Sequence, residues 1–306
     1  MSEAPLRVLV GGTASGKKAV AAELHRRHGV QLLSMDSMKV YRGMDIGTDK
    51  PGAELQRAAP FALLDLVGHD EPFSAGQWLR AAQAVLAASG APPLFAGGTP
   101  FYLRLLLRGL CPSPPVDRAL RAELAALWDE AGEPEVRRRL AALDAPAEAR
   151  LLPGDGKRVL RALEVALLTG RPLSDWQREH TRRPLPGRVL VAALRHASDA
   201  QQRRIEARVE RMLAAGLLDE VCGLLARAPF APEPGRAIGY AEALAHLRGE
   251  LPAAALRERI VVRTRQLVRK QRLHLQQFEE LRWVDVQEGE DAARVAGRAA
   301  EALELA

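Results

Sequence analysis

The sequence predicts an α/β fold, in which a parallel sheet is flanked by helices, with an all-helical insertion and a basic C-terminal helical region. Three observations support this prediction. Short apolar runs alternate with helical patterns between residues 6 and 110, a Pro-rich stretch at 111–115 then opens a segment of wholly helical pattern, and another apolar run follows at 188–194. Because alternating strands and helices are typical of a parallel sheet, we expect this late run to rejoin the first sheet as its fifth strand.

The first element carries the clearest functional signal. The apolar run 6–10 predicts a strand, and a helical pattern that ends near Gly29 predicts the first helix; between them stands the stretch Gly11-Gly12-Thr13-Ala14-Ser15-Gly16-Lys17-Lys18. Two glycines five residues apart and a lysine, placed between a strand and a helix, predict a phosphate-binding loop and therefore a P-loop NTPase-like sheet. The next position usually supplies a Ser or Thr hydroxyl to magnesium, but here it is Lys18.

A carboxylate follows the second predicted strand. Residues 30–35 form this apolar run, and Asp36 comes directly after it. Ligands bind to open parallel sheets at the carboxyl ends of the strands. Asp36 therefore has two functional interpretations, as a general base or a magnesium ligand, and one structural interpretation, as the N-cap of a short helix.

The next elements continue the alternation. Residues 61–67 predict a third strand, and Ser74 with Gln77 forms a capping box that opens a helix running to residue 88. Residues 93–96 predict a fourth strand, which stops at Gly97-Gly98-Thr99. These glycines allow a close approach of the backbone to a ligand, although a plain turn is the alternative.

We expect two domains. Residues 1–115 and 186–306 would form the P-loop core with C-terminal RNA-binding helices, and residues 116–185 would form the helical insertion. Within the insertion, helices are expected at 120–131, 134–143 and 156–168. Its basic residues Lys157, Arg158 and Arg161 have two interpretations, a solvated face or a patch that faces RNA.

The C-terminal part is basic on one side. A helix is expected at 200–215, a glycine turn at 234–240, and a long helix at 256–278. Between Arg257 and Arg272 there are seven basic residues and one acidic residue. This imbalance favours a helix that lies along a phosphate backbone, with a solvated charged face as the alternative.

The composition limits the class of protein. A net charge of +6 favours a polyanionic partner, although only six of the 44 lysines and arginines are lysine. The two cysteines, Cys111 and Cys222, make a disulfide framework unexpected and suit a reducing, cytoplasmic location. No apolar run approaches the ~18 residues of a membrane span, no signal peptide is expected, and no cluster of Cys and His predicts a metal site.

Taken together, the motifs resemble those of the bacterial tRNA dimethylallyltransferases, also called tRNA isopentenyltransferases. Gly11–Lys17 is similar to their GPTASGK loop, and residues 36–48 are similar to their DSxxVYRGMDIGT segment. The other matches, in the same order along residues 6–280, are Gly97-Gly98-Thr99 with Tyr102 (GGTxxY), Lys157-Arg158 with residues 161–164 (the RALE helix), Arg204-Ile205 with Arg208, Met212 and Gly216-Leu217 (RIxxR), Ile238-Gly239-Tyr240 (IGY), and Thr264-Arg265-Gln266 with Gln271 (TRQxxxxQ).

The resemblance implies transfer of a dimethylallyl group from dimethylallyl diphosphate to N6 of the adenine just 3′ of the anticodon. It implies that Asp36 is the general base, that Thr99 positions the adenine, and that Thr13, Lys17, Arg208 and the loop Gly11–Lys18 hold the diphosphate. The residues implied to bind tRNA are Asp36, Ser37, Met38, Lys39, Thr99, Arg121, Lys157, Arg158, Arg161, Arg236, Gly239, Tyr240, Arg269, Lys270 and Gln271. It also implies magnesium and the tRNA anticodon stem-loop as partner. We expect a monomer with no protein partner and no membrane association.

Four positions depart from the family pattern. Gly12 replaces a proline, Lys39 a glutamine and His274 a tryptophan, and Lys18 removes the hydroxyl assigned to magnesium. Two other functions stay open for this sequence. One is an ATP-dependent P-loop kinase of a small molecule, and the other is a catalytically impaired RNA-binding homologue.

Overall fold

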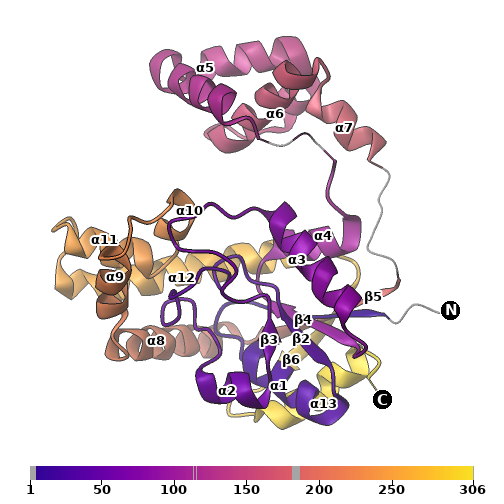
Figure 1. Cartoon of the computed structure of the whole chain (residues 1–306). Helices are drawn as coiled ribbons and strands as arrows, with labels where there is room; N and C mark the ends of the chain where they lie inside the picture. Colours follow the sequence, from indigo (N-terminus) through magenta and orange to yellow (C-terminus); the bar gives the residue numbers. More distant parts are fainter. Residues whose placement is uncertain (1–4, 113, 115, 181–186, 306) are drawn as a thin grey trace. The chain divides into compact units, whose positions relative to one another are not determined.

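The computed structural model describes residues 5–112, 114, 116–180 and 187–305. The chain divides into two compact units (Figure 1), Met1–Leu107 with Pro186–Ala306, and Arg108–Leu185. The domain boundaries expected at residues 115 and 185–186 fall outside the described residues. No helix in the described part is long and apolar enough to cross a membrane.

A parallel sheet organises the first unit. Its six strands within the described residues have the order β3-β2-β4-β1-β5-β6, with β1 at Leu6–Gly11, β2 at Gln31–Ser34, β3 at Phe61–Ala62, β4 at Pro93–Gly97, β5 at Val189–His196 and β6 at Leu281–Val286. The prediction of a parallel sheet is therefore confirmed. The late strand β5 pairs with β1, with Leu9 opposite Ala192, so the chain does rejoin its first sheet after the insertion.

Helices cover both faces of the sheet. On one face, α1 (Lys17–His28) and α13 (Ala292–Ala302) pack together, and Leu24 and Val295 join Leu9 in a buried cluster. On the other face lie α3 (Ala75–Ala88), which begins with the expected capping box, and α4 (Pro100–Arg108). Trp78 of α3 stacks on Tyr102 with ring centroids 4.2 Å apart and donates its indole N–H to Ser34 O at 3.1 Å. This bond fixes the end of β2, the strand that precedes Asp36.

The sequence prediction was wrong for several elements of this unit. The third strand is shorter than the expected 61–67, because Leu63 and Asp65 have φ of +65° and +54° and end the ladder. Strand β6 and helix α13 were not predicted, nor were the short helices α2 (Ala53–Ala58), α9 (Leu217–Leu225) and α10 (Pro232–Gly235).

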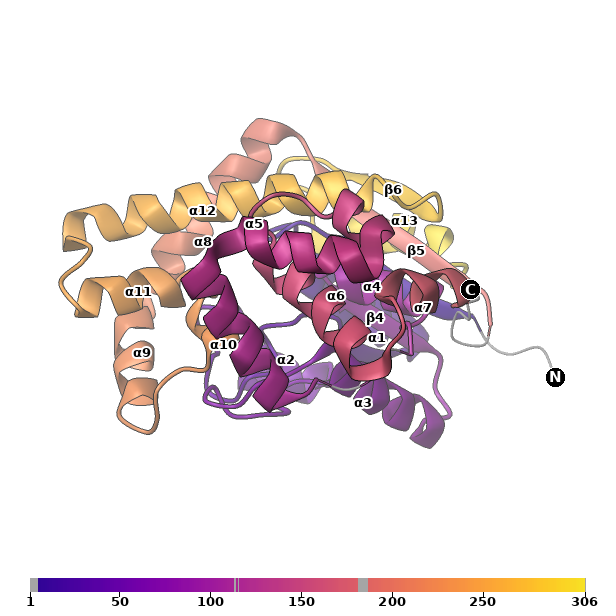
Figure 2. The same ribbon diagram turned by 90° about the horizontal axis from the view of Figure 1, so that it is seen from above.

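Two long helices form the C-terminal side of the first unit. Helix α8 (Ser198–Ala214) packs beside α12 (Ala253–Leu275), and α11 (Tyr240–Leu247) packs along α12 as well (Figure 2). The apolar side of α12 is buried at Leu256, Ile260 and Leu275. Arg263 departs from the expected basic face, because it is half-buried and paired with the buried carboxylate of Glu242.

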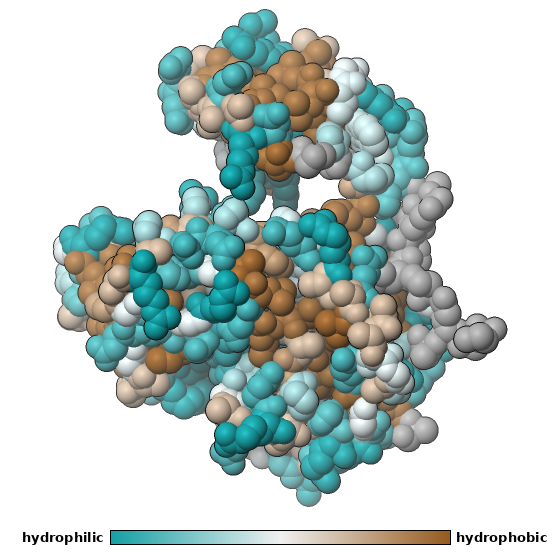
Figure 3. Space-filling model, viewed as in Figure 1, coloured by the Kyte–Doolittle hydropathy of each residue, from teal (hydrophilic) through white to brown (hydrophobic). Residues whose placement is uncertain are grey.

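The second unit is helical. It contains α5 (Arg118–Arg150), α6 (Gly156–Thr169) and α7 (Leu173–Glu179), of which α7 was not predicted. Helix α5 is interrupted at Gly132, with φ +77°, which separates the helices expected at 120–131 and 134–143. Leucines at 143, 152, 167 and 168 are exposed, and hydrophobic residues show at the surface of this unit (Figure 3).

Candidate active site

Four strand ends meet at the carboxyl edge of the sheet. The phosphate-binding loop follows β1, Asp36 follows β2, Gly97-Gly98-Thr99 ends β4, and His196 ends β5. A Cβ at Gly97 would lie 1.9 Å from Met35 O, so only glycine allows β2 and β4 to approach this closely. Thr99 Oγ1 accepts a hydrogen bond from the Ser37 amide at 3.1 Å, which joins the turn after β4 to the turn that carries Asp36.

Asp36 lies in a tight turn rather than at a helix start. Its Oδ1 accepts a hydrogen bond from the Met38 amide at 2.9 Å. All residues from 35 to 52 are described and none is helical. The interpretation of Asp36 as a helix N-cap was therefore wrong, and its half-exposed carboxylate is held next to the phosphate loop.

Side chains from β5 and α8 hold the outside of the phosphate loop. Gln201 donates to Thr13 O at 2.7 Å, Arg204 donates to Ala14 O at 2.8 Å, and His196 Nε2 lies 2.9 Å from Ser15 O. Gly16 has φ of +83° and precedes the first turn of α1. These side chains bind three carbonyls of the loop, and the first turn of α1, which follows the loop, can bind an anion through its backbone amides.

Gln271 fixes the loop from α12. Its Oε1 accepts hydrogen bonds from the Thr13 amide at 3.0 Å and the Thr13 hydroxyl at 3.3 Å, and its Nε2 donates to Gly98 O at 2.7 Å. Gln271 is buried. It was expected to bind tRNA, but its amide is already occupied in joining the phosphate loop to the turn after β4.

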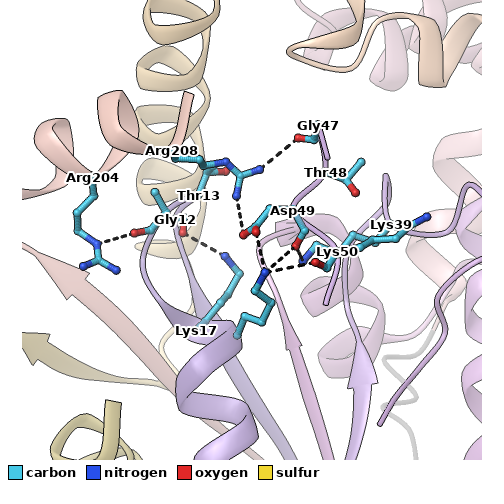
Figure 4. A network of polar contacts seen from close by, with 12 residues as sticks. Gly12, Thr13, Lys17, Lys39, Gly47, Thr48, Asp49, Lys50, Arg204 and Arg208 are labelled. Carbon is cyan, nitrogen blue, oxygen red and sulfur yellow. Dashed lines mark hydrogen bonds and ion pairs between the residues drawn. The ribbon is translucent and has the colours of Figure 1, made fainter. Parts of the chain in front are cut away.

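Cations gather around one carboxylate beside the loop (Figure 4). Lys18 Nζ lies 2.6 Å from Asp49 Oδ1, and Arg208 Nη1 lies 2.9 Å from Asp49 Oδ2. Lys39 Nζ donates to Asp49 O at 2.8 Å. Lys17 Nζ donates to Gly12 O at 3.1 Å, within the same network. We call Lys17, Lys18, Lys39, Arg208 and Asp49 the cation cluster.

Burial and mutual repulsion tune the cluster. Burial lowers the pKa of Lys17 to about 8, with a further lowering by Lys39 that Asp36 partly offsets. Burial likewise lowers the pKa of Lys39. Burial alone would raise the pKa of Asp49, but Arg208 and Lys18 lower it below its ordinary value. The site thus holds more positive charge than its carboxylates balance, as an anion site requires.

Glu220 supports the segment that carries Asp49, a role that the sequence motifs did not indicate. One Glu220 oxygen accepts hydrogen bonds from the amides of Asp45 and Ile46 at 3.1 and 2.8 Å, and the other accepts from the Tyr240 hydroxyl at 2.5 Å. These bonds fix the loop that leads to Asp49. Tyr240 and Gly239, expected to bind tRNA, are both buried: Tyr240 holds this loop through Glu220, and the Gly239 amide donates to Glu242 at 2.7 Å.

The expected tRNA contacts on basic side chains divide into a partly buried, ion-paired group and an exposed group. Arg121 and Arg161 both pair with Glu164, which is fully buried. Their guanidinium groups therefore help to hold the helical unit together, and their contact with tRNA phosphates stays a prediction. The residues that are exposed as expected are Lys157, Arg158, Arg236, Arg269 and Lys270.

The donor set does not fit magnesium. Mg²⁺ needs oxygen ligands in octahedral geometry, yet the position that usually supplies a hydroxyl is an ammonium. Both oxygens of the carboxylate that Lys18 contacts, Asp49, already accept from cations. Among the described residues, no group of three or more His, Cys, Asp or Glu could hold a metal ion.

The lowered pKa of Lys17 predicts a pH dependence. Since an ammonium binds an anion only in its charged form, the affinity for inorganic diphosphate should fall as the pH rises past about 8. Relative to Lys17→Arg, which stays charged, we expect a loss of up to about tenfold between pH 7.5 and pH 9. Calorimetric titration of both proteins measures this, and parallel pH profiles would contradict the assignment.

Comparisons with known proteins point in one direction. The family model for IPP transferase matches residues 39–277. A tRNA dimethylallyltransferase of Geobacter metallireducens is 42% identical over 284 residues, which is 92% of each chain. The structure is similar to a tRNA isopentenylpyrophosphate transferase of Bacillus halodurans, with TM-score 0.71, 28% identity and coverage of 99% of this chain and 97% of that one.

A second solved structure shares the fold. It is a eukaryotic dimethylallyltransferase acting on tRNA, with TM-score 0.81, 23% identity and coverage of 97% of this chain and 78% of the other.

Proposed function

The chain belongs to the IPP transferase family, and on this premise we propose that it transfers a dimethylallyl group from dimethylallyl diphosphate to N6 of the adenosine immediately 3′ of the anticodon in tRNA. The observation that carries the proposal is the meeting of the phosphate loop and Asp36 at one edge of the sheet, with Thr99 bonded to the turn that carries Asp36. Relatives named tRNA dimethylallyltransferase support the same reaction.

Each part of the site has a task in this reaction. A neutral exocyclic amine is a weak nucleophile, so Asp36 accepts a proton from N6 as the nitrogen attacks the allylic carbon. The C–O bond to the diphosphate breaks, and negative charge grows on the leaving oxygen. Lys17, Arg208 and the amides of the loop stabilise this charge. Thr99 positions the adenine. None of these steps uses the magnesium ion that the family resemblance implies.

The adenine reaches Asp36 only outside the base stack of the anticodon loop, so the proposal includes base flipping. Exposed basic residues on each unit would contact RNA phosphates and fix its register rather than read its sequence. A small-molecule kinase would not need such residues, which disfavours that alternative. A monomeric state and a cytoplasmic location stay predictions.

Mass spectrometry of an anticodon stem-loop tests the function. Incubation with the protein and dimethylallyl diphosphate should add one dimethylallyl group to a substrate RNA, and none to an RNA with guanosine at the target position. Transfer of phosphate from ATP to a small molecule, with no change in the RNA, would favour the kinase. Binding of the RNA without modification would favour the catalytically impaired homologue.

The exposed pair Arg269 and Lys270 predicts a salt dependence. Replacing both with alanine should weaken tRNA binding and reduce the log–log slope of affinity against salt by up to ~2, about one for each lost phosphate contact. The control is Arg248→Ala with Glu250→Ala, a surface ion pair elsewhere in the same unit. Filter binding between low and moderate salt measures both slopes. An unchanged slope would mean that the basic side of α12 is a solvated charged face that does not contact RNA phosphates.

A further inference from the structure

We propose that Lys18, together with Lys39 and Arg208, supplies the positive charge that a divalent cation supplies at other phosphate loops, so that this chain binds diphosphate without a metal. The inference deepens the proposed function, since diphosphate is the leaving group of that reaction. It concerns three side chains that converge on Asp49 from three separate parts of the chain.

The place of Lys18 is the first observation. It lies in the first turn of α1, directly after Lys17, where a phosphate loop usually has a hydroxyl that binds Mg²⁺. The Lys18 side chain does not extend into solvent: it is 28% exposed, and its Nζ lies 2.6 Å from Asp49 Oδ1 and 3.3 Å from the carbonyls of Asp49 and Lys50. Three oxygens of Asp49 and Lys50 therefore hold the ammonium beside the phosphate loop.

The state of Asp49 is the second observation. A carboxylate beside a phosphate loop is the natural partner of a metal ion, but here each oxygen of Asp49 already pairs with a cation. Lys39 adds a third cation at the Asp49 carbonyl, 2.8 Å away. A dication placed among these groups would have to displace two ion pairs and approach several positive charges. Both effects weaken its binding.

An anion meets the opposite situation. The first turn of α1 already favours negative charge, and a compact ammonium on a flexible stem can pair directly with a phosphate oxygen. Asp49 then acts as an internal counter-ion, which keeps the cations in position until diphosphate arrives to share them. Two lysines and an arginine on separate segments can each pair with a diphosphate oxygen.

The test is the affinity for inorganic diphosphate, measured by calorimetry in EDTA and in saturating Mg²⁺. For the unaltered protein we expect affinities within about threefold of each other, or weaker binding in Mg²⁺. Lys18→Thr, which restores the hydroxyl, should bind about tenfold more weakly in EDTA, the loss of one charge-assisted hydrogen bond, and should recover with Mg²⁺.

Two further variants separate charge from hydroxyl. Lys18→Met should bind weakly in both buffers, whereas Lys18→Arg should stay independent of Mg²⁺. Thermal melts check that each variant is folded, and the comparison of the two buffers for the unaltered protein needs no variant. The inference is wrong if Mg²⁺ tightens binding to the unaltered protein as much as to Lys18→Thr, or if neither buffer supports binding.

The outcomes for the two proposals are distinguishable. A protein that binds diphosphate equally well in both buffers but leaves every anticodon stem-loop unmodified refutes the proposed function and supports this inference. A protein that modifies RNA but needs Mg²⁺ to bind diphosphate supports the proposed function and refutes this inference.

Discussion

Asp36→Asn should lower the single-turnover rate of dimethylallyl transfer by a factor of ~10²–10⁴, the usual contribution of a general base. The amide cannot accept the N6 proton. The fold should be retained, because an asparagine Oδ1 can accept the same hydrogen bond from the Met38 amide that Asp36 accepts at 2.9 Å. Loss of activity would therefore report on proton transfer and not on the turn.

The assay pH matters for this variant. Asp36 raises the pKa of Lys17, so its neutralisation lowers that pKa further below the present value of about 8. In an assay well below that pKa Lys17 stays charged in both proteins, and diphosphate should bind the variant with nearly unchanged affinity. Asp70→Asn, at an exposed position, is the matched control. A rate within about threefold of the unaltered protein would remove Asp36 from this role.

Local motifs allowed the sheet and its phosphate loop to be predicted. The loop, the capping box of α3 and the glycine turn after β4 are each encoded within a few residues, and strands buried in a parallel sheet appear as continuous apolar runs. The last strand lacked this signal. Leu281–Val286 contains Arg282 and Asp285, and only Val284 is buried, because β6 lies at the edge of the sheet.

The intramolecular contacts of residues whose partners are distant in sequence could not be predicted. Gln271 bonds to Thr13 across 258 residues, and Arg121 pairs with Glu164 across 43. A polar side chain that is buried against such a partner looks the same in the sequence as one that faces RNA. Conversely, Asp49 stood inside a recognised polar segment, but nothing in the sequence indicated that three cations would surround it.

Replacing Arg208 of the cation cluster is the second substitution that we expect to lower the transfer rate strongly. Arg208 is 15% exposed at its side chain, and it bridges Asp49 Oδ2 at 2.9 Å and Gly47 O at 3.2 Å. A guanidinium fixed by two contacts is pre-organised for the charge that develops on the departing diphosphate. Arg208→Ala should therefore lower the rate of transfer by ~10²–10³, the scale of one lost electrostatic donor.

Arg208→Lys should not restore the rate, because a single ammonium cannot keep both contacts of the fork. The tRNA affinity of either variant should stay close to that of the unaltered protein, since the Arg208 guanidinium is bound to Asp49 and Gly47 and its side chain is largely buried. Arg211→Ala, one turn further along α8 and exposed, is the control for loss of an arginine from this helix. Single-turnover rates and tRNA affinities of the variants test this prediction. If Arg208→Ala keeps the rate of Arg211→Ala, or loses only tRNA affinity, then Arg208, the cation bound to Asp49 Oδ2, does not stabilise the leaving diphosphate, and other groups must do so.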